Sequence, residues 1–116
     1  MSNYGRLRSE AEFKAVRSAR KVRRSTSMLV YQAPGPSETP RLGIVATVSL
    51  GTAVRRNRIK RRLRAAFGFE VAQAAAFRDF VIVAKPATAS VSFAELRAEI
   101  ARAISSAPGP TGDAPR

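Results

Sequence analysis

The pattern of apolar and polar positions divides the chain into alternating helical and extended segments. Apolar residues recur at helical spacing over about residues 9–18, 53–67 and 93–104. Runs rich in β-branched and other apolar residues, which favour strands, occupy residues 27–31, 42–48 and 79–84. The predicted order of elements is therefore helix, strand, strand, helix, strand, helix.

Capping signals support the helix starts. Ser9 and Glu12 have the S-x-x-E spacing of a capping box, and Ser92 and Glu95 repeat it before the last helix. Thr52 can cap the middle helix, although no capping box follows it. These signals indicate helix starts near residues 9, 53 and 93.

Loop signals are equally clear between the first two strands. Residues 33–40 contain three prolines and a glycine, which cannot continue a strand. We therefore expect the strands on either side to form a hairpin. Gly68 is a candidate end or bend of the middle helix, and residues 70–77 could add further helix.

The length and the C-terminal composition predict one domain. A chain of 116 residues with 45% apolar residues can bury a single modest core. From Ala107 onward the chain consists mainly of Pro, Gly and small polar residues, which bury too little surface to order. The expected division is a domain at residues 1–106 and a disordered tail at residues 107–116.

The charge points to a polyanionic partner and narrows the possible chemistry. There are 21 Lys and Arg against 8 Asp and Glu, a formal net charge of +13, so nucleic acid is the first partner to consider. The absence of Cys and His removes disulfides, the usual zinc ligands and the commonest general base. The eight carboxylates are scattered along the chain and form no close acidic cluster of the kind that a metal-dependent nuclease needs, so we assign no catalytic residue and no metal ligand, although folding could still assemble a pair. No apolar run approaches 18 residues and no signal-peptide core is evident, so a cytoplasmic protein without membrane contact is expected.

The middle helix concentrates this charge. Residues 55–64 carry seven positive side chains in ten positions and no acidic one. Like charges at i,i+4, such as Arg56 and Lys60, cost an isolated helix roughly 0.2–0.5 kcal/mol per pair, so folding gains nothing from them. Docking on a polyanion offsets this repulsion because each neutralised phosphate releases counterions. A charge run is more often a solvated face, but this one has an apolar stripe and lies between strands.

The densest part of the pattern resembles the protein subunit of bacterial ribonuclease P. The resemblance covers roughly residues 4–105 and is most specific at the RNR signature, Gly51-x-Ala53-Val54-x-Arg56-Asn57-Arg58-x-Lys60-Arg61-x-x-Arg64. Flanking segments fall where that family places similar residues; they are Glu12-Phe13-x-x-Val16, Leu29-Val30-Tyr31, Arg41-x-Gly43-Ile44 and Asp79-Phe80-Val81-Ile82-Val83-Ala84. Each flank alone is a weak signal, and their order and spacing together make a strong one.

The resemblance implies an α+β fold, a single small α/β sandwich with a roughly four-stranded central sheet and helices packed on it. It also implies that the RNR helix belongs to a left-handed βαβ crossover. General rules would have favoured the other hand, because such crossovers are right-handed in about 98% of cases.

The function that the resemblance implies is removal of the 5′ leader from precursor tRNA. In that family the catalytic entity is an RNA that uses Mg²⁺, so this chain would supply no catalytic residue and no organic cofactor. Its expected partners are the catalytic ribonuclease P RNA and precursor tRNA, with no duplex DNA.

Two RNA-facing surfaces follow from the resemblance. The first would meet the catalytic RNA and consists of Arg56, Asn57, Arg58, Lys60, Arg61 and Arg64. Arginines suit that task because their planar forks bind phosphate oxygens and stack on bases. The second is a cleft for the single-stranded leader, assigned to Phe13, Arg17, Tyr31, Lys60 and Asn57. An aromatic face stacks on any base and so binds leaders with little sequence preference. Without the resemblance, a lone aromatic such as Phe13 is more often a core residue.

The chain departs from the family pattern at two places. It has Arg17 where the family often has a second Phe, and Val48 and Ser49 where the family often has paired lysines. Arg17 can still stack through its guanidinium plane. The basic cluster Arg20–Arg24 is a candidate replacement for the missing lysines.

Other functional classes make different predictions. A stand-alone basic RNA-binding or ribosomal protein would bind RNA without affecting leader cleavage. A DNA-binding module would place residues 53–67 in the major groove, but so uniformly basic a helix lacks the mixed polar residues typical of base readout.

Overall fold

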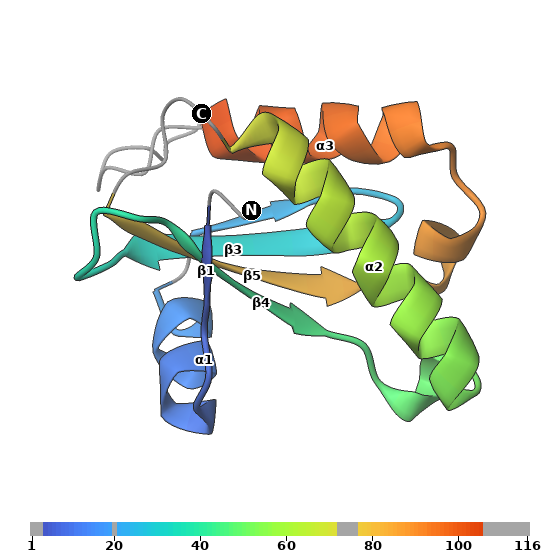
Figure 1. The fold of residues 1–116 in the computed structure, drawn as a ribbon, viewed down its shortest axis with the longest axis horizontal. Coiled ribbons are helices and arrows are strands. Elements are labelled where there is room, and N and C mark those ends of the chain that lie inside the picture. Colours follow the sequence, from blue (N-terminus) through green and yellow to red (C-terminus); the bar gives the residue numbers. More distant parts are fainter. Residues whose placement is uncertain (1–3, 20, 72–76, 106–116) are drawn as a thin grey trace.

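The computed structural model describes residues 4–19, 21–71 and 77–105, which form a five-stranded sheet and three α-helices (Figure 1). The helices are α1 (Glu10–Arg17), α2 (Ala53–Glu70) and α3 (Phe93–Ser105). The strands are β1 (Gly5–Arg6), β2 (Val22–Arg24), β3 (Met28–Pro34), β4 (Arg41–Val45) and β5 (Arg78–Ala84). Two short 3₁₀ helices, η1 (Val48–Leu50) and η2 (Pro86–Ala89), precede α2 and α3. The predicted order of the six main elements is confirmed, and the predicted tail at residues 107–116 lies outside the described residues.

The sheet order corrects the expected hairpin. The strands lie in the order β1-β4-β5-β3-β2, so β5 separates β3 from β4. It pairs antiparallel with β3 and parallel with β4. Residues 78–84 are buried at six of seven positions, and a strand this apolar is most stable at the centre of a sheet. Sequence proximity favoured pairing β3 with β4, but the burial of β5 decides the arrangement.

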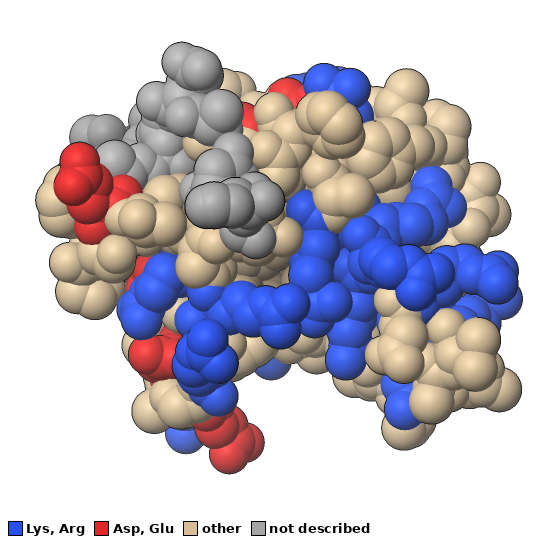
Figure 2. Space-filling view, in the orientation of Figure 1, with Lys and Arg blue, Asp and Glu red and all other residues tan. Residues whose placement is uncertain are grey.

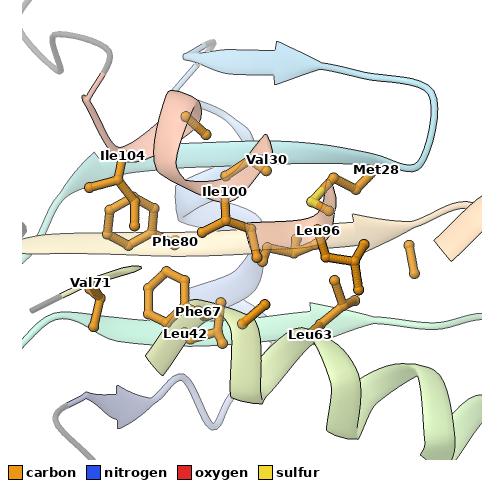
Figure 3. Close-up of a cluster of buried hydrophobic side chains, with 14 of the residues drawn as sticks. Met28, Val30, Leu42, Leu63, Phe67, Val71, Phe80, Leu96, Ile100 and Ile104 are labelled. Atoms are coloured by element: carbon orange, nitrogen blue, oxygen red, sulfur yellow. The ribbon is translucent and has the colours of Figure 1, made fainter. Parts of the chain in front are cut away.

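Strand alternation gives the sheet two apolar faces. Leu42 on β4, Phe80 on β5 and Val30 on β3 lie on the face covered by α2 and α3, in the larger core (Figure 3). The rings of Phe67 on α2 and Phe80 meet edge to face, with centroids 5.2 Å apart. Val81 lies on the opposite face, where Leu7 and Val16 of the N-terminal region form a smaller core. Phe67 and Phe80 are core residues as predicted, and Phe93 is half-buried against the larger core.

The two predicted capping boxes begin real helices. In α1 the Ser9 hydroxyl accepts from the Glu12 amide, and the Glu12 carboxylate accepts from the Ser9 amide. At α3 the Ser92 hydroxyl accepts a hydrogen bond from the Glu95 amide. Helix α2 does not end at Gly68 but continues to Glu70, because the burial of Phe67 and Val71 offsets the roughly 1 kcal/mol cost of a helical glycine. Residues 72–76, where further helix was a candidate, lie outside the described residues.

Helix α2 connects two adjacent parallel strands. The chain leaves β4, passes through η1 and α2 in front of the sheet, and returns as β5 beside β4 (Figure 1). Followed in Figure 1, this path is a left-handed crossover, as the family resemblance implied and against the general rule. The consequence is that α2 begins beside the carboxyl end of β4, with its first turns extending beyond the sheet. No helix among the described residues is long and apolar enough to span a bilayer.

Candidate nucleic-acid interface

The basic helix starts at a tight turn that only glycine fits well. Gly51 has φ +123°, a conformation that other residues rarely adopt, and a Cβ there would lie 2.6 Å from Arg55 Cδ. Thr52 then caps the helix, its hydroxyl accepting from the Arg55 amide at 3.2 Å. The Arg56 guanidinium donates to the Gly51 carbonyl at 2.9 Å. This turn fixes the direction in which the first basic side chains project.

The predicted RNA-facing residues project from one broad surface of α2. Ile59, Leu63 and Phe67 are buried against the sheet, and their burial fixes the rotation of the helix. On the opposite side Asn57, Arg58 and Arg61 are exposed. Lys60 and Arg64 are half-buried on the flank of the helix, and Arg56 is half-buried one turn before Ile59, in line with the buried stripe. Lys and Arg side chains cover much of this face of the molecule (Figure 2). The structure therefore brings all six predicted residues together on one helix.

One arginine of α2 has a structural role. Arg62 donates to the carbonyl oxygens of Ala89, at 3.2 Å, and Val91, at 2.5 Å, and so holds the segment before α3. These two partners distinguish Arg62 from Arg58 and Arg61, which are exposed. Not every charge of the basic run is available to a ligand.

A separate cleft lies beside α1, on the other face of the sheet. Its volume is about 710 Å³, and its lining includes Phe13 and Arg17 from α1 and Tyr31 from β3. Lys14 adds a second positive charge to the lining of the cleft, and Glu10, the first residue of α1, adds a negative one. The three predicted leader residues that lie in this region are thus brought into one cleft.

Arg17 contributes to the cleft through Tyr31. Its guanidinium carbon lies 5.5 Å from the centre of the Tyr31 ring, within the range of a cation–π contact. The position therefore keeps a planar group beside an aromatic ring although it lacks the second Phe of the family pattern. Positive charge here also suits a phosphate-bearing ligand.

The position of Phe13 is set by strand β4. A Cβ on Gly43 would lie 2.4 Å from Phe13 Cζ, so the ring packs against the bare backbone of that strand. Two residues earlier, Arg41 lies on the same side of β4 and reaches the residue before Phe13. Its Nη1 donates to Glu12 Oε2 at 3.1 Å. Adjacent residues of α1 are therefore anchored to alternate residues of β4.

Arg41 also joins this anchor to the centre of the sheet. Its Nε and Nη2 donate to the two carboxylate oxygens of Asp79, at 3.0 Å and 2.8 Å. This paired hydrogen bond raises the pKa of Arg41. Backbone amides of Arg8 and Ser9 lower the pKa of Glu12, and the charge of Arg41 adds to this effect. Glu12 and Arg41 are therefore held in their charged forms.

Two predicted leader residues do not reach this cleft. Asn57 and Lys60 lie on α2, which covers the opposite face of the sheet, and neither lines the cleft beside α1. The prediction grouped them with Phe13 because the family resemblance suggests roles for residues but gives no distances between them. In the structure Asn57 and Lys60 lie on α2, next to its arginines.

The candidate replacement for the missing lysines is also far from them. Val48 and Ser49 are exposed in η1, directly after β4. Strand β2, which holds Arg23 and Arg24, lies at the far edge of the sheet, with β3 and β5 between it and β4. The part of the cluster that the structure describes therefore does not occupy the place of residues 48–49, and Arg20 lies outside the described residues.

Sequence reasoning missed the roles of Arg41 and Gly43. Both belong to a segment that matched the family, but the sequence did not show that this segment faces α1. No group of three or more His, Asp or Glu side chains that could hold a metal ion is found in the described part of the chain.

Comparisons with known proteins find relatives that match most of the chain. The family model described as Ribonuclease P matches residues 1–107. The ribonuclease P protein component of Acidothermus cellulolyticus is 40% identical over 102 residues, covering 85% of this chain and 84% of that protein. That of Pseudarthrobacter chlorophenolicus is 35% identical over 107 residues, covering 91% and 79%.

Solved structures show the same fold. The RNase P protein from Thermotoga maritima superposes with a TM-score of 0.78 at 24% identity, covering 90% of this chain and 98% of that one. The RNase P protein of Staphylococcus aureus gives a TM-score of 0.71 at 22% identity, with coverages of 84% and 90%.

Proposed function

The chain belongs to the ribonuclease P protein family, and from this premise we propose how it binds its RNA partners. As a member it is a subunit of an endoribonuclease of tRNA processing whose catalysis is performed by RNA. We propose that α2 binds the catalytic RNA and that the cleft beside α1 binds the single-stranded 5′ leader of precursor tRNA.

The arrangement of α2 carries this proposal. Six polar side chains, five of them cationic, extend from a helix that is fixed in the core through Ile59, Leu63 and Phe67, and Asn57, Arg58 and Arg61 lie exposed opposite that core. Because the helix backbone is already ordered, binding of phosphates has only the side chains to order, and each contact releases condensed counterions. The Arg58 and Arg61 guanidinium groups can bind phosphate oxygens in pairs, and Asn57 can both donate and accept hydrogen bonds.

The cleft beside α1 suits a single strand. Phe13 and Tyr31 are half-buried, so part of each ring remains available for stacking, and Arg17 supplies a guanidinium plane beside them. Stacking on aromatic rings is worth about 1–3 kcal/mol per base and is tolerant of sequence. Such a cleft would accept the varied leaders that a general tRNA-processing enzyme meets.

We assign the chemistry and its Mg²⁺ mainly to the RNA partner. RNA phosphates supply the oxygen ligands that Mg²⁺ prefers, and the protein screens their charge through α2. The relatives are bacterial proteins, so we place the complex in the cytoplasm, where bacterial tRNA is processed.

Leader-dependent affinity tests this proposal. Binding of precursor tRNA and of mature tRNA is compared for the catalytic RNA alone and for the RNA with this protein. We expect the protein to strengthen binding of the precursor much more than that of the mature form. Equal strengthening of both would argue against a leader cleft, and tight RNA binding without any effect on precursor would favour a stand-alone RNA-binding protein.

A further inference from the structure

We propose that Arg6 and Arg8 extend the RNA-binding surface of α2 along the N-terminal segment, residues 4–8, as far as the start of α1. The ligand would be the phosphate backbone of the catalytic RNA. This inference rests on the proposed function, because it enlarges the surface assigned to the same partner.

The N-terminal segment is fixed to the edge of the sheet. Strand β1 pairs in parallel with β4, with Gly5 opposite Arg41 and Arg6 opposite Leu42. The Gly5 amide donates to the Pro40 carbonyl at 2.7 Å, and the Leu7 amide donates to the Leu42 carbonyl at 3.1 Å. The side chains of this segment therefore have defined directions.

Tyr4 fastens the segment to α2. Its hydroxyl donates to the Arg64 carbonyl at 3.2 Å, and its ring meets Phe67 edge to face with centroids 5.1 Å apart. Burial raises the pKa of the Tyr4 hydroxyl, while the positive charges of Arg64 and Arg6 oppose that rise. Both cations thus lie close to the same hydroxyl, which places Arg6 beside the basic surface of α2.

Alternation along the segment separates apolar and basic side chains. Leu7 is 5% exposed and packs in the smaller core under α1, whereas Arg6 points to the other side of the sheet, beside Leu42. Arg8 is exposed immediately before α1. Figure 2 shows Lys and Arg side chains in a band that crosses this face from α2 over the N-terminal segment.

Among the described residues, the side chains of Arg6 and Arg8 gain no partner from folding. In the described part of the chain, the side chains of Arg6 and Arg8 form neither an ion pair nor a hydrogen bond. Placing Arg6 near Arg64 brings like charges together, which folding alone does not reward. A phosphate backbone that runs along the band offsets this repulsion by releasing counterions.

The position of Arg6 favours the catalytic RNA over the leader. Arg6 lies on the α2 side of the sheet, whereas the cleft assigned to the leader lies on the α1 side and does not include Arg6 or Arg8 in its lining. Continuity with α2 therefore points to one long RNA contact.

The salt dependence of binding tests this inference. Affinity for the catalytic RNA is measured over a range of salt concentrations for the wild type and for Arg6→Ala, Arg8→Ala and the double variant. Each lost phosphate contact should make the slope of log K against log salt shallower by about 0.7–0.9. Arg6→Lys, which keeps the charge, should restore most of the slope. Preference for precursor over mature tRNA should not change.

Arg23→Ala is the matched control. Arg23 is also an exposed arginine on a short edge strand, but it lies on β2 at the opposite edge of the sheet. The Arg23→Ala substitution removes the same charge and should leave the slope of log K against log salt unchanged. An unchanged slope in Arg6→Ala and Arg8→Ala would overturn the inference, as would an equal loss in Arg23→Ala or a loss confined to leader-bearing RNA.

The failure of this inference can be told from failure of the proposed function. If the wild type binds the catalytic RNA with a steep salt dependence while both variants match it, only the N-terminal extension is wrong. If the wild type itself does not bind the RNA, the proposed function is wrong. Thermal unfolding of each variant confirms that β1 still pairs with β4.

Discussion

The ring of Phe13 packs against the backbone of Gly43, so closely that a Cβ on Gly43 would lie 2.4 Å from Phe13 Cζ. The same strand holds Glu12, the preceding residue of α1, through Arg41. Two contacts of neighbouring residues therefore fix α1 on the sheet and set one wall of the cleft assigned to the leader.

Gly43→Ala should displace the Phe13 ring. Overpacking of this kind costs about 1–3 kcal/mol of unfolding free energy, and moving the ring should reduce the preference for precursor over mature tRNA. Both quantities can be measured on the same protein, by denaturant unfolding and by RNA binding. In a Phe13→Ala background the added methyl group has room, so its effect on stability should largely disappear. Equal costs in both backgrounds would show that the two residues do not interact.

Phe13→Ala should weaken precursor binding far more than mature tRNA binding. A stacked base contributes about 1–3 kcal/mol, and only the precursor carries the leader. Phe69→Ala is the control, because Phe69 is an exposed aromatic residue on α2, outside the cleft. Equal losses for the two RNAs would indicate that Phe13 serves only the core.

Arg58→Ala and Arg61→Ala should each make the salt dependence of catalytic-RNA binding shallower by about one unit if each contacts a phosphate. Arg62→Ala is a control on the same helix, since Arg62 is bonded to the Ala89 and Val91 carbonyls. It should lower the melting temperature and change the slope less. If the three variants shift the slope equally, net charge and not position on α2 governs binding.

Glu12→Gln should change how stability depends on pH. The pKa of Glu12 is lowered in the folded protein by the Arg8 and Ser9 amides, so its carboxylate stabilises the fold above the unfolded pKa of about 4.3. That contribution is lost as pH falls through the lower folded pKa. Thermal unfolding between about pH 3 and pH 7 should therefore show a lower stability for the variant at neutral pH and a smaller loss toward acid. Parallel curves for the two proteins would contradict this role.

Local patterns predicted the elements well because their causes are local. The capping residues Ser9 and Ser92 and the apolar stripe through Ile59 and Leu63 determine helix starts and rotation without reference to distant residues. The order of strands could not be obtained in this way. The insertion of β5 between β3 and β4 depends on which strand gains most from burial on both faces, and that is a property of the whole sheet.

In the candidate site, too, features that depend on one element could be predicted and features that depend on several elements could not. Which side chains of α2 are exposed could be read from the sequence, because helical periodicity fixes which residues lie away from the buried stripe. Their role in binding RNA stays a prediction. The cleft joins α1 to β3 and depends on β4, so the contacts of Arg41 and Gly43 were missed. Lys60 and Asn57 were grouped with Phe13, although they lie on α2 and do not line this cleft. A match to a family position suggests a role for a residue, but only the tertiary structure gives the distances between residues.

Cleavage of precursor tRNA tests the central claim most directly. The 5′ leader is removed by the cognate ribonuclease P RNA at limiting Mg²⁺, with and without this protein, and the protein alone is included as a control. We predict strong stimulation by the protein and no cleavage by the protein alone, because α2 screens RNA charge that Mg²⁺ would otherwise have to neutralise. An absence of stimulation despite tight binding to the cognate RNA would contradict the account.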